Sequence, residues 1–147
     1  MVDDQAIELL LIEDSKEDAE LTLRSLKKMN LEHRMKVLVD GEDALNFIYS
    51  KGKYADNVGA LNPKLILLDL KLPKIDGMEI LRRLKSDENK KTIPVVVLTS
   101  SDEERDIVES YRLGVNSYIV KPVDSENFTK AVDGIGLYWL LLNHPIN

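Results

Sequence analysis

Five polar residues that could take part in chemistry stand at the ends of short apolar runs in the sequence. Glu13 and Asp14 follow one run, Asp69 follows another, Thr99 ends a third, and Lys121 follows the last. If the runs are parallel strands of one sheet, these residues lie at the same edge and the three carboxylates converge. Two unit charges about 4 Å apart repel by roughly 4 kcal/mol at an effective dielectric of 20, so such a cluster requires a cation.

The residue types indicate which cation and which reaction this edge would support. The chain has no cysteine, so oxygen atoms must hold the ion, and Mg²⁺ prefers one or two carboxylates together with a phosphate oxygen. No segment has the acid and glycine spacing of a Ca²⁺-binding EF-hand. Lys121 and Thr99 supply a positive charge and a hydroxyl that stabilise a phosphoryl group. The set predicts Mg²⁺-dependent phosphoryl transfer with Asp69 as the nucleophile.

Each of these residues, taken alone, also has an ordinary structural interpretation. Asp14 is typical of a helix start, Asp69 of a turn, Thr99 of a cap and Lys121 of a solvated charge at a strand end. Their joint placement at the ends of several predicted strands favours the functional interpretation.

The elements that must position these residues follow from the hydrophobic pattern. Continuously apolar runs, typical of strands buried on both faces, occupy residues 7–12, 36–39, 65–68 and 94–98, and a shorter strand is expected at 117–120. Segments with helical spacing lie between the runs. Helix starts are expected from capping boxes at Ser15 with Asp18 and at Ser101 with Glu104, and from N-caps at Asp40 and Ser125.

The alternation of strand and helix predicts an α/β fold, with a doubly wound five-stranded parallel sheet and helices on both faces. In such a fold the ligand site lies at the carboxyl ends of the strands. The connection at residues 50–63 is long for this plan and is expected to be a surface loop.

Composition limits the classes of protein that fit. A chain of 147 residues with 44% hydrophobic and 31% charged residues predicts a single compact domain over 1–147. The net charge of −6 works against nucleic acid or an anionic membrane surface as a partner. The acidic N-terminus does not resemble a signal peptide, and no apolar run has the length of a membrane span. We therefore expect a cytoplasmic protein.

Four motifs resemble, in order, those of the response-regulator receiver family. They are Leu11-Ile12-Glu13-Asp14-Ser15, Asp69-Leu70-Lys71-Leu72-Pro73 followed by Asp76-Gly77, Val97-Leu98-Thr99-Ser100-Ser101, and Tyr118-Ile119-Val120-Lys121-Pro122. The resemblance extends over about residues 9–135, with the core expected at about 7–135. It implies a flavodoxin-like sheet with the strand order 2-1-3-4-5.

The resemblance also implies roles for the acidic residues. Asp69 would take a phosphoryl group from a phosphohistidine on a sensor histidine kinase. Mg²⁺ would be held by Asp14, Asp69 and the main-chain carbonyl of Lys71, with Glu13 acting mainly through a metal-bound water. The protein would then be a signalling switch that catalyses only its own phosphoryl transfer and slow autodephosphorylation.

The remaining motif residues would carry the signal. The resemblance implies that Thr99 and Lys121 contact the phosphoryl oxygens and that Tyr118 is the aromatic residue that rotates when the site is occupied. Without the motif, a tyrosine on a short strand is more often half-buried packing. Lys71 and Ser101 each stand two positions beyond a site residue, and we expect them to flank the path of attacking water and to set the aspartyl-phosphate lifetime.

The C-terminal region, about 125–147, is predicted to be a helix followed by an apolar tail. The segment 138–142 is expected to form a homodimer contact, with packing onto its own domain as the alternative. Because few residues follow, we expect no DNA-binding output domain, and the readout would be a downstream protein target or the kinase itself. The long second connection and the leucine-rich tail resemble single-domain regulators of phytochrome-type histidine kinases.

Three rival functions share parts of this pattern, but each lacks support in the sequence. A phosphatase of the haloacid-dehalogenase type needs a second aspartate two residues after the nucleophile as general acid, and that position is Lys71. A nucleotide or flavin module needs a phosphate-cradling glycine loop after the first strand, where this chain has Glu13-Asp14. A degenerate receiver used only for binding would not need the intact acidic set, Thr99 and Lys121.

Overall fold

The computed structural model describes residues 8–29, 35–57 and 63–135. A single parallel sheet forms the centre of this part of the chain, with strands in the order β2-β1-β3-β4-β5, as the resemblance implied. The strands are β1 (Leu9–Ile12), β2 (Met35–Leu38), β3 (Leu65–Leu68), β4 (Val95–Thr99) and β5 (Ser117–Val120). The predicted doubly wound α/β fold is confirmed.

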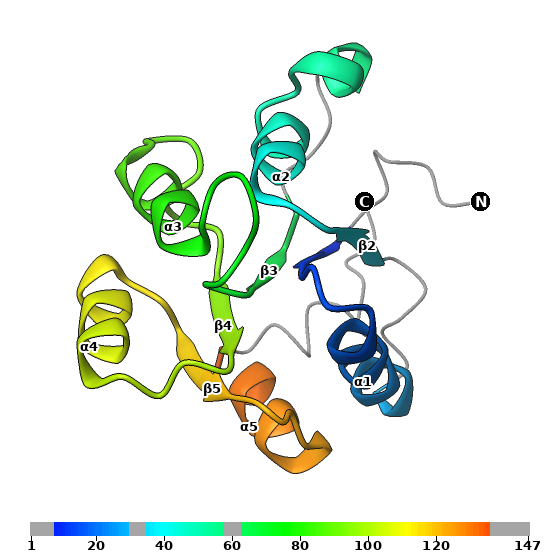
Figure 1. Ribbon diagram of the computed structural model, residues 1–147, viewed down its shortest axis with the longest axis vertical. Helices are drawn as coiled ribbons and strands as arrows, with labels where there is room; N and C mark the ends of the chain where they lie inside the picture. Colours follow the sequence, from blue (N-terminus) through cyan, green and yellow to red (C-terminus); the bar gives the residue numbers. More distant parts are fainter. Residues whose placement is uncertain (1–7, 30–34, 58–62, 136–147) are drawn as a thin grey trace, which may run out of the picture.

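Helices cover both faces of the sheet (Figure 1). They are α1 (Lys16–Lys28), α2 (Gly41–Ile48), α3 (Gly77–Ser86), α4 (Glu104–Leu113) and α5 (Ser125–Ile135), with a 3-10 helix η3 (Gly52–Asn57) after α2. Alternate residues of β1 point to opposite faces: Leu10 and Ile12 pack in the core beneath α2 and α3, while Leu9 and Leu11 pack with Leu26 of α1 and other residues on the α1 and α5 face.

Strand β2 differs from the buried strand that its apolar run predicts. Val37 is 39% exposed and Val39, just beyond the strand, is 55% exposed. The prediction that this run is buried on both faces is wrong because β2 is the edge strand, with β1 as its sheet neighbour. The central strands β1, β3 and β4 are buried throughout.

Two of the four expected helix caps are confirmed. The Ser15 hydroxyl accepts a hydrogen bond from the Asp18 N–H at 3.2 Å, and the Asp40 carboxylate accepts one from the Asp43 N–H at 2.7 Å. Helix α5 is instead capped by Asp124, whose carboxylate accepts from the Asn127 N–H at 2.8 Å. The expected N-cap at Ser125 is therefore wrong by one position.

The expected capping box at Ser101 is also wrong. Helix α4 begins at Glu104, and its cap residue Glu103 makes no side-chain cap bond. The Ser101 hydroxyl is occupied elsewhere, because it donates to Asp106 at 2.6 Å. An unexpected cap occurs at Asp76, whose carboxylate accepts from the Glu79 N–H at the start of α3.

The long connection after α2 is partly structured. Residues 52–57 form η3, and Tyr54 within it is only 8% exposed. The Tyr54 ring packs edge-on against Phe47 with centroids 5.1 Å apart, and its hydroxyl donates to Asp43 at 3.2 Å. The expectation of a plain surface loop is wrong for these residues, since they dock on α2.

Within the described residues, no helix is both long and apolar enough to cross a membrane. The predicted tail contact at 138–142 lies outside the residues that the structure describes.

Candidate functional site

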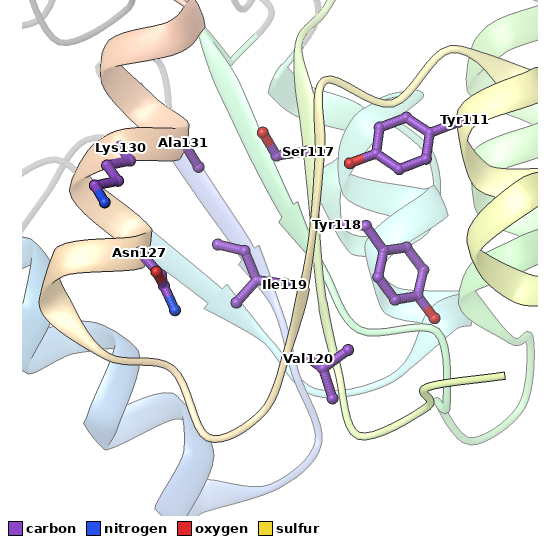
Figure 2. A pocket seen from close by; sticks show the side chains of 8 residues that line it. All are labelled: Tyr111, Ser117, Tyr118, Ile119, Val120, Asn127, Lys130 and Ala131. Carbon is purple, nitrogen blue, oxygen red and sulfur yellow. The ribbon is translucent and has the colours of Figure 1, made fainter. Parts of the chain in front are cut away.

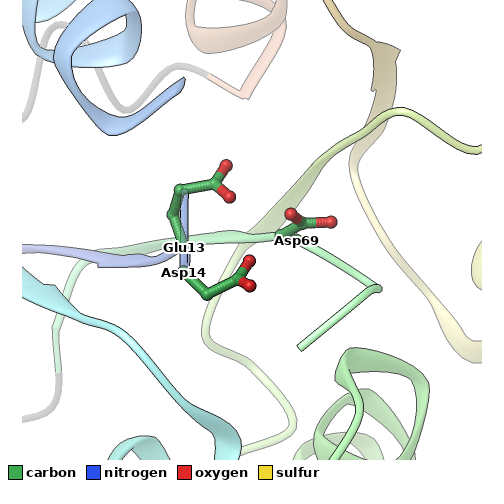
Figure 3. A group of neighbouring side chains, drawn as sticks. All are labelled: Glu13, Asp14 and Asp69. Carbon is green, nitrogen blue, oxygen red and sulfur yellow. The ribbon is translucent and has the colours of Figure 1, made fainter. Parts of the chain in front are cut away.

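The three carboxylates singled out by the sequence meet at the carboxyl edge of the sheet. One ligand oxygen from each of Glu13, Asp14 and Asp69 lies within 4.8 Å of the others, at the ends of β1 and β3 (Figure 3). Backbone pairing produces this convergence, because the Asp69 N–H donates to the Ile12 carbonyl at 3.0 Å. Glu13 and Asp69 are buried, at 1% and 5% exposure, whereas Asp14 is exposed.

Lys121 supplies the positive charge of the cluster. Its Nζ lies 2.6 Å from Glu13 Oε1, 2.9 Å from Asp18 Oδ2 and 3.0 Å from Asp69 Oδ2. The backbone positions it, since the Lys121 N–H donates to the Thr99 carbonyl at 2.8 Å; the Lys121–Pro122 peptide bond is cis. Asp18 was not predicted as a site residue. It was expected to complete a capping box with Ser15, but the Ser15 N–H donates to Glu13 Oε2 at 3.2 Å and the Asp18 carboxylate faces Lys121 instead.

Burial and crowding shift the pKa values of this cluster. Burial, followed by the neighbouring Asp69, raises the pKa of Glu13 from 4.5 to about 7, against the opposing effect of Lys121. Burial lowers the pKa of Lys121, but its bonds to Glu13, Asp18 and Asp69 outweigh burial and raise it above its ordinary value. The Lys121 ammonium therefore stays charged, and Glu13 carries a penalised negative charge near neutral pH.

The loop after β3 orients the Asp69 carboxylate. The Lys71 N–H donates to Asp69 Oδ1 at 3.0 Å, while Oδ2 faces Lys121. Gly77 closes this loop by donating its N–H to the Leu70 carbonyl at 2.9 Å. A Cβ at position 77 would lie 2.2 Å from the Asp69 carbonyl oxygen, so only glycine permits this approach. The sequence motif contained Gly77, but no role was predicted for it.

Thr99, Ser101 and Tyr118 form a connected group at the ends of β4 and β5. Thr99 is fully buried, and its Oγ1 accepts from the Ser101 N–H at 3.4 Å. The Tyr118 hydroxyl donates to the Ser101 carbonyl at 2.9 Å. Figure 2 shows the Tyr118 ring on the α4 side of β5. The tyrosine is thus half-buried and bonded directly to the loop that follows Thr99.

Lys71 and Ser101 meet a residue that sequence reasoning missed. Asp106 Oδ2, in the first turn of α4, accepts the Ser101 hydroxyl at 2.6 Å and lies 3.9 Å from Lys71 Nζ. Burial raises the pKa of Tyr118 against the opposing hydrogen bond to Ser101, and the negative charges of Asp106, Asp102 and Glu103 add to the rise. The only sequence signal for Asp106 as a site residue was its position in the first turn of a predicted helix, and acidic residues are too common there to be informative.

The donor set fits a small, hard divalent cation. The converging ligand atoms are all carboxylate oxygens, the type that Mg²⁺ and Mn²⁺ prefer. Glu13 Oε1 is buried, and the one ammonium beside it, at 2.6 Å, is shared with Asp18 and Asp69, so Lys121 faces three carboxylates at once. A cation beside the exposed Asp14 would offset this unfavourable cluster, and Lys121 could face an anion bound next to it.

Strand order and site together define the class of protein. The order β2-β1-β3-β4-β5 is flavodoxin-like, and the polar site lies where the order reverses, between β1 and β3. The Response regulator receiver domain family matches residues 9–133. The chain belongs to this family, which confirms the resemblance and argues against the phosphatase and the nucleotide or flavin module.

Several known proteins are similar over most of their length. The chain is 43% identical over 132 residues to Response regulator Rcp1 of Synechocystis sp., covering 90% of this chain and 88% of that protein. The solved Mn(2+)-bound form of Rcp1 is 41% identical with a TM-score of 0.74, covering 95% of this chain and 96% of that one.

Two further solved structures come from phytochrome systems. Bacteriophytochrome response regulator RtBRR is 46% identical with a TM-score of 0.82, covering 94% of this chain and 82% of that chain. The phosphorylated cyanobacterial phytochrome response regulator RcpA is 41% identical with a TM-score of 0.74, covering 92% of this chain and 95% of that chain.

Proposed function

We propose that this chain is a phospho-accepting response regulator whose Asp69 takes a phosphoryl group from a sensor histidine kinase. The observation that carries the proposal is the contact of Asp69 Oδ2 with Lys121 Nζ at 3.0 Å, inside a cluster of three convergent carboxylates. An anion-stabilising lysine beside a buried aspartate is the arrangement that phosphoryl transfer requires. The phosphorylated RcpA structure supports it.

The metal in this proposal is Mg²⁺, which Asp14, Asp69 and the main-chain carbonyl of Lys71 would hold, with Glu13 completing the acidic cluster around it. The Mn(2+)-bound form of Rcp1 supports a divalent ion in this type of site. When bound, the ion supplies positive charge that offsets the carboxylates and the phosphoryl oxygens.

The protein residues position and stabilise the transferred group. An Asp69 carboxylate oxygen forms a bond to phosphorus, the bond from phosphorus to the kinase histidine nitrogen breaks, and its electron pair leaves with the imidazole. Lys121 already lies among three carboxylates, so it can exchange part of that contact for a phosphoryl oxygen. Thr99, buried at the end of β4, offers its hydroxyl as a donor. The reaction consumes and returns no other group.

The switch would run from Thr99 to Tyr118. Moving a two-state equilibrium from mostly inactive to mostly active takes about 5.5 kcal/mol, and charge-assisted bonds to Thr99 and Lys121 of roughly 1.5 to 3 kcal/mol each could supply much of it. When Thr99 turns to the phosphoryl group, the loop at Ser101 that holds the Tyr118 hydroxyl moves with it, since both residues are bonded to Ser101.

Tyr118 also belongs to the surface where a downstream protein would bind. It lines a pocket of about 510 Å³ beside β5, between Tyr111 of α4 and Lys130 of α5 (Figure 2). Val120, which lines the same pocket and is 40% exposed, adds apolar surface to it. Movement of the Tyr118 ring therefore changes a surface that a partner protein can recognise.

The partner and context remain part of the proposal. The phytochrome response regulators among the relatives support a phytochrome-type kinase as the phosphodonor. A single receiver domain over 1–147, a cytoplasmic location, a homodimer through the C-terminal region, and activity limited to self-phosphorylation and slow autodephosphorylation stay predictions.

Phosphorylation with a small donor tests the proposal. Wild-type protein incubated with acetyl phosphate and Mg²⁺ is expected to gain one base-labile phosphoryl group that maps to Asp69, and Asp69→Asn is expected to gain none. Asp76→Asn is a matched control, because Asp76 is in the same loop but caps α3. Failure of wild type to gain the group, or a gain on another residue, would refute the proposal and favour a receiver used only for binding.

A further inference from the structure

The carboxylate of Asp106 joins the two loops that carry the reactive residues. Its Oδ2 accepts a hydrogen bond at 2.6 Å from the hydroxyl of Ser101, which is in the loop after β4. The same oxygen lies 3.9 Å from Nζ of Lys71, which is in the loop after β3. The Asp106 side chain is only 18% exposed. Asp106 therefore reaches the side chains of two loop residues, Ser101 and Lys71, that follow the reactive residues Thr99 and Asp69.

The contact with Ser101 is the stronger of the two. A hydroxyl donating to a carboxylate at this distance is a short, charge-assisted hydrogen bond, and Ser101 is buried at 9% exposure. The same serine donates its N–H to Thr99 Oγ1 and accepts the Tyr118 hydroxyl at its carbonyl. Asp106 therefore stabilises the loop conformation to which both switch residues are bonded.

The contact with Lys71 is weaker, but it influences where the Lys71 ammonium lies. The Lys71 side chain is 61% exposed, so its ion pair with Asp106 is weak: it favours one orientation of the lysine without fixing it. Its backbone N–H is bonded to Asp69 Oδ1 at 3.0 Å, so the side chain starts beside Asp69 and can turn either toward α4 or over the site. A phosphoryl group on Asp69 would compete with Asp106 for the same ammonium.

We propose that Asp106 is a positioning residue that draws the Lys71 ammonium toward α4, keeps water's approach to phosphorylated Asp69 open, and thereby shortens the phosphoryl lifetime. The inference rests on the proposed function, in which Asp69 is phosphorylated. In the hydrolysis, a water oxygen bonds to phosphorus, the bond from phosphorus to the Asp69 oxygen breaks with its electron pair returning to the carboxylate, and both water protons leave with inorganic phosphate. Without the charge of Asp106, Lys71 would lie over the phosphoryl group and obstruct that water.

Asp106→Asn separates the two contacts, because asparagine keeps an oxygen acceptor for Ser101 and loses the charge that attracts Lys71. After labelling with acetyl phosphate and removal of the donor, its aspartyl phosphate is expected to decay about two- to fivefold more slowly than wild type, the range of an exposed ion pair. Glu104→Gln is the matched control, since Glu104 is an exposed acid in the same first turn of α4, and is expected to decay like wild type.

The Lys71→Met background gives a readout that a merely structural role would not move. When Lys71 is already methionine, adding Asp106→Asn is expected to leave the decay rate unchanged, because no lysine ammonium remains for Asp106 to attract. Wild-type decay in Asp106→Asn, or equal slowing in the Lys71→Met background, would overturn the inference while Asp69 labelling keeps the proposed function intact. Absence of labelling in wild type would instead refute the proposed function. Asp106→Ser serves the same comparison should Asp106→Asn unfold.

Discussion

The buried Glu13 carboxylate is expected to destabilise the metal-free protein at neutral pH. Burial, followed by Asp69, raises its pKa from 4.5 to about 7 even though Lys121 lies 2.6 Å away. A rise of this size corresponds to about 3 kcal/mol of unfolding free energy. Replacing Glu13 by the neutral, nearly isosteric glutamine is therefore expected to stabilise the fold while weakening metal binding.

The sign of the pH dependence follows from the direction of the pKa shift. Since the folded-state pKa is above the unfolded value of 4.5, the penalty is nearly absent below pH 4.5, grows as the pH rises, and is complete above about pH 7. In EDTA, the unfolding free energy of Glu13→Gln minus that of wild type should increase by about 3 kcal/mol between pH 4.5 and pH 8. Urea unfolding at several pH values measures this difference, and acids common to both proteins cancel.

Two comparisons make the test specific. Glu20→Gln removes an exposed acid of α1 and should show no such pH-dependent gain. Mg²⁺ at pH 8 should raise the stability of wild type more than that of Glu13→Gln, since the ion offsets the charge that the variant lacks. A difference between Glu13→Gln and wild type that stays flat from pH 4.5 to pH 8 would refute the reasoning.

Three other substitutions have definite expected outcomes. Lys121→Met leaves the carboxylates of Glu13 and Asp69 without the ammonium that they share. Its unfolding free energy, measured with urea in EDTA, should fall by about 3 to 5 kcal/mol, and the loss should be smaller in Mg²⁺. An equal loss in EDTA and in Mg²⁺ would contradict this account. Gly77→Ala places a Cβ 2.2 Å from the Asp69 carbonyl oxygen, so it should lower the unfolding free energy by about 1 to 3 kcal/mol and slow the labelling of Asp69 by acetyl phosphate. A melting temperature and a labelling rate equal to those of wild type would show that the loop adapts. Tyr118→Phe removes the 2.9 Å hydrogen bond to the Ser101 carbonyl, so its unfolding free energy in urea should fall by about 0.5 to 1.5 kcal/mol while the labelling of Asp69 stays unchanged. A change in the labelling rate would place the Tyr118 hydroxyl in the transfer step.

Much of the site could be predicted because it depends on strand ends. The apolar runs located β3 and β5 at their observed residues and the other strands to within two, and polar residues directly after parallel strands must share one edge. The capping role of Ser15 and Asp40 was predictable for the same local reason, since a cap bonds to a residue three positions on.

Contacts between distant segments were not predictable in this way. Asp18 reaches Lys121 across 103 positions, and Lys71 reaches Asp106 from another loop. Ser101 was read as a helix cap because its local pattern matched one, but its hydroxyl found a carboxylate in α4. A local signal cannot show which of several acceptors a side chain meets, because the choice depends on how neighbouring elements pack.

By itself, the sequence determined the alternation of strands and helices, the order of the reactive residues along the chain, and their convergence at one edge, since these follow from periodicity and from the parallel connection of strands. Tertiary structure alone decided that η3 docks on α2 through Tyr54, that Asp18 contacts Lys121, and that Asp106 contacts Ser101 and Lys71. Side-chain contacts across a fold depend on the relative placement of elements within about an ångström, and hydrophobic periodicity carries no such information.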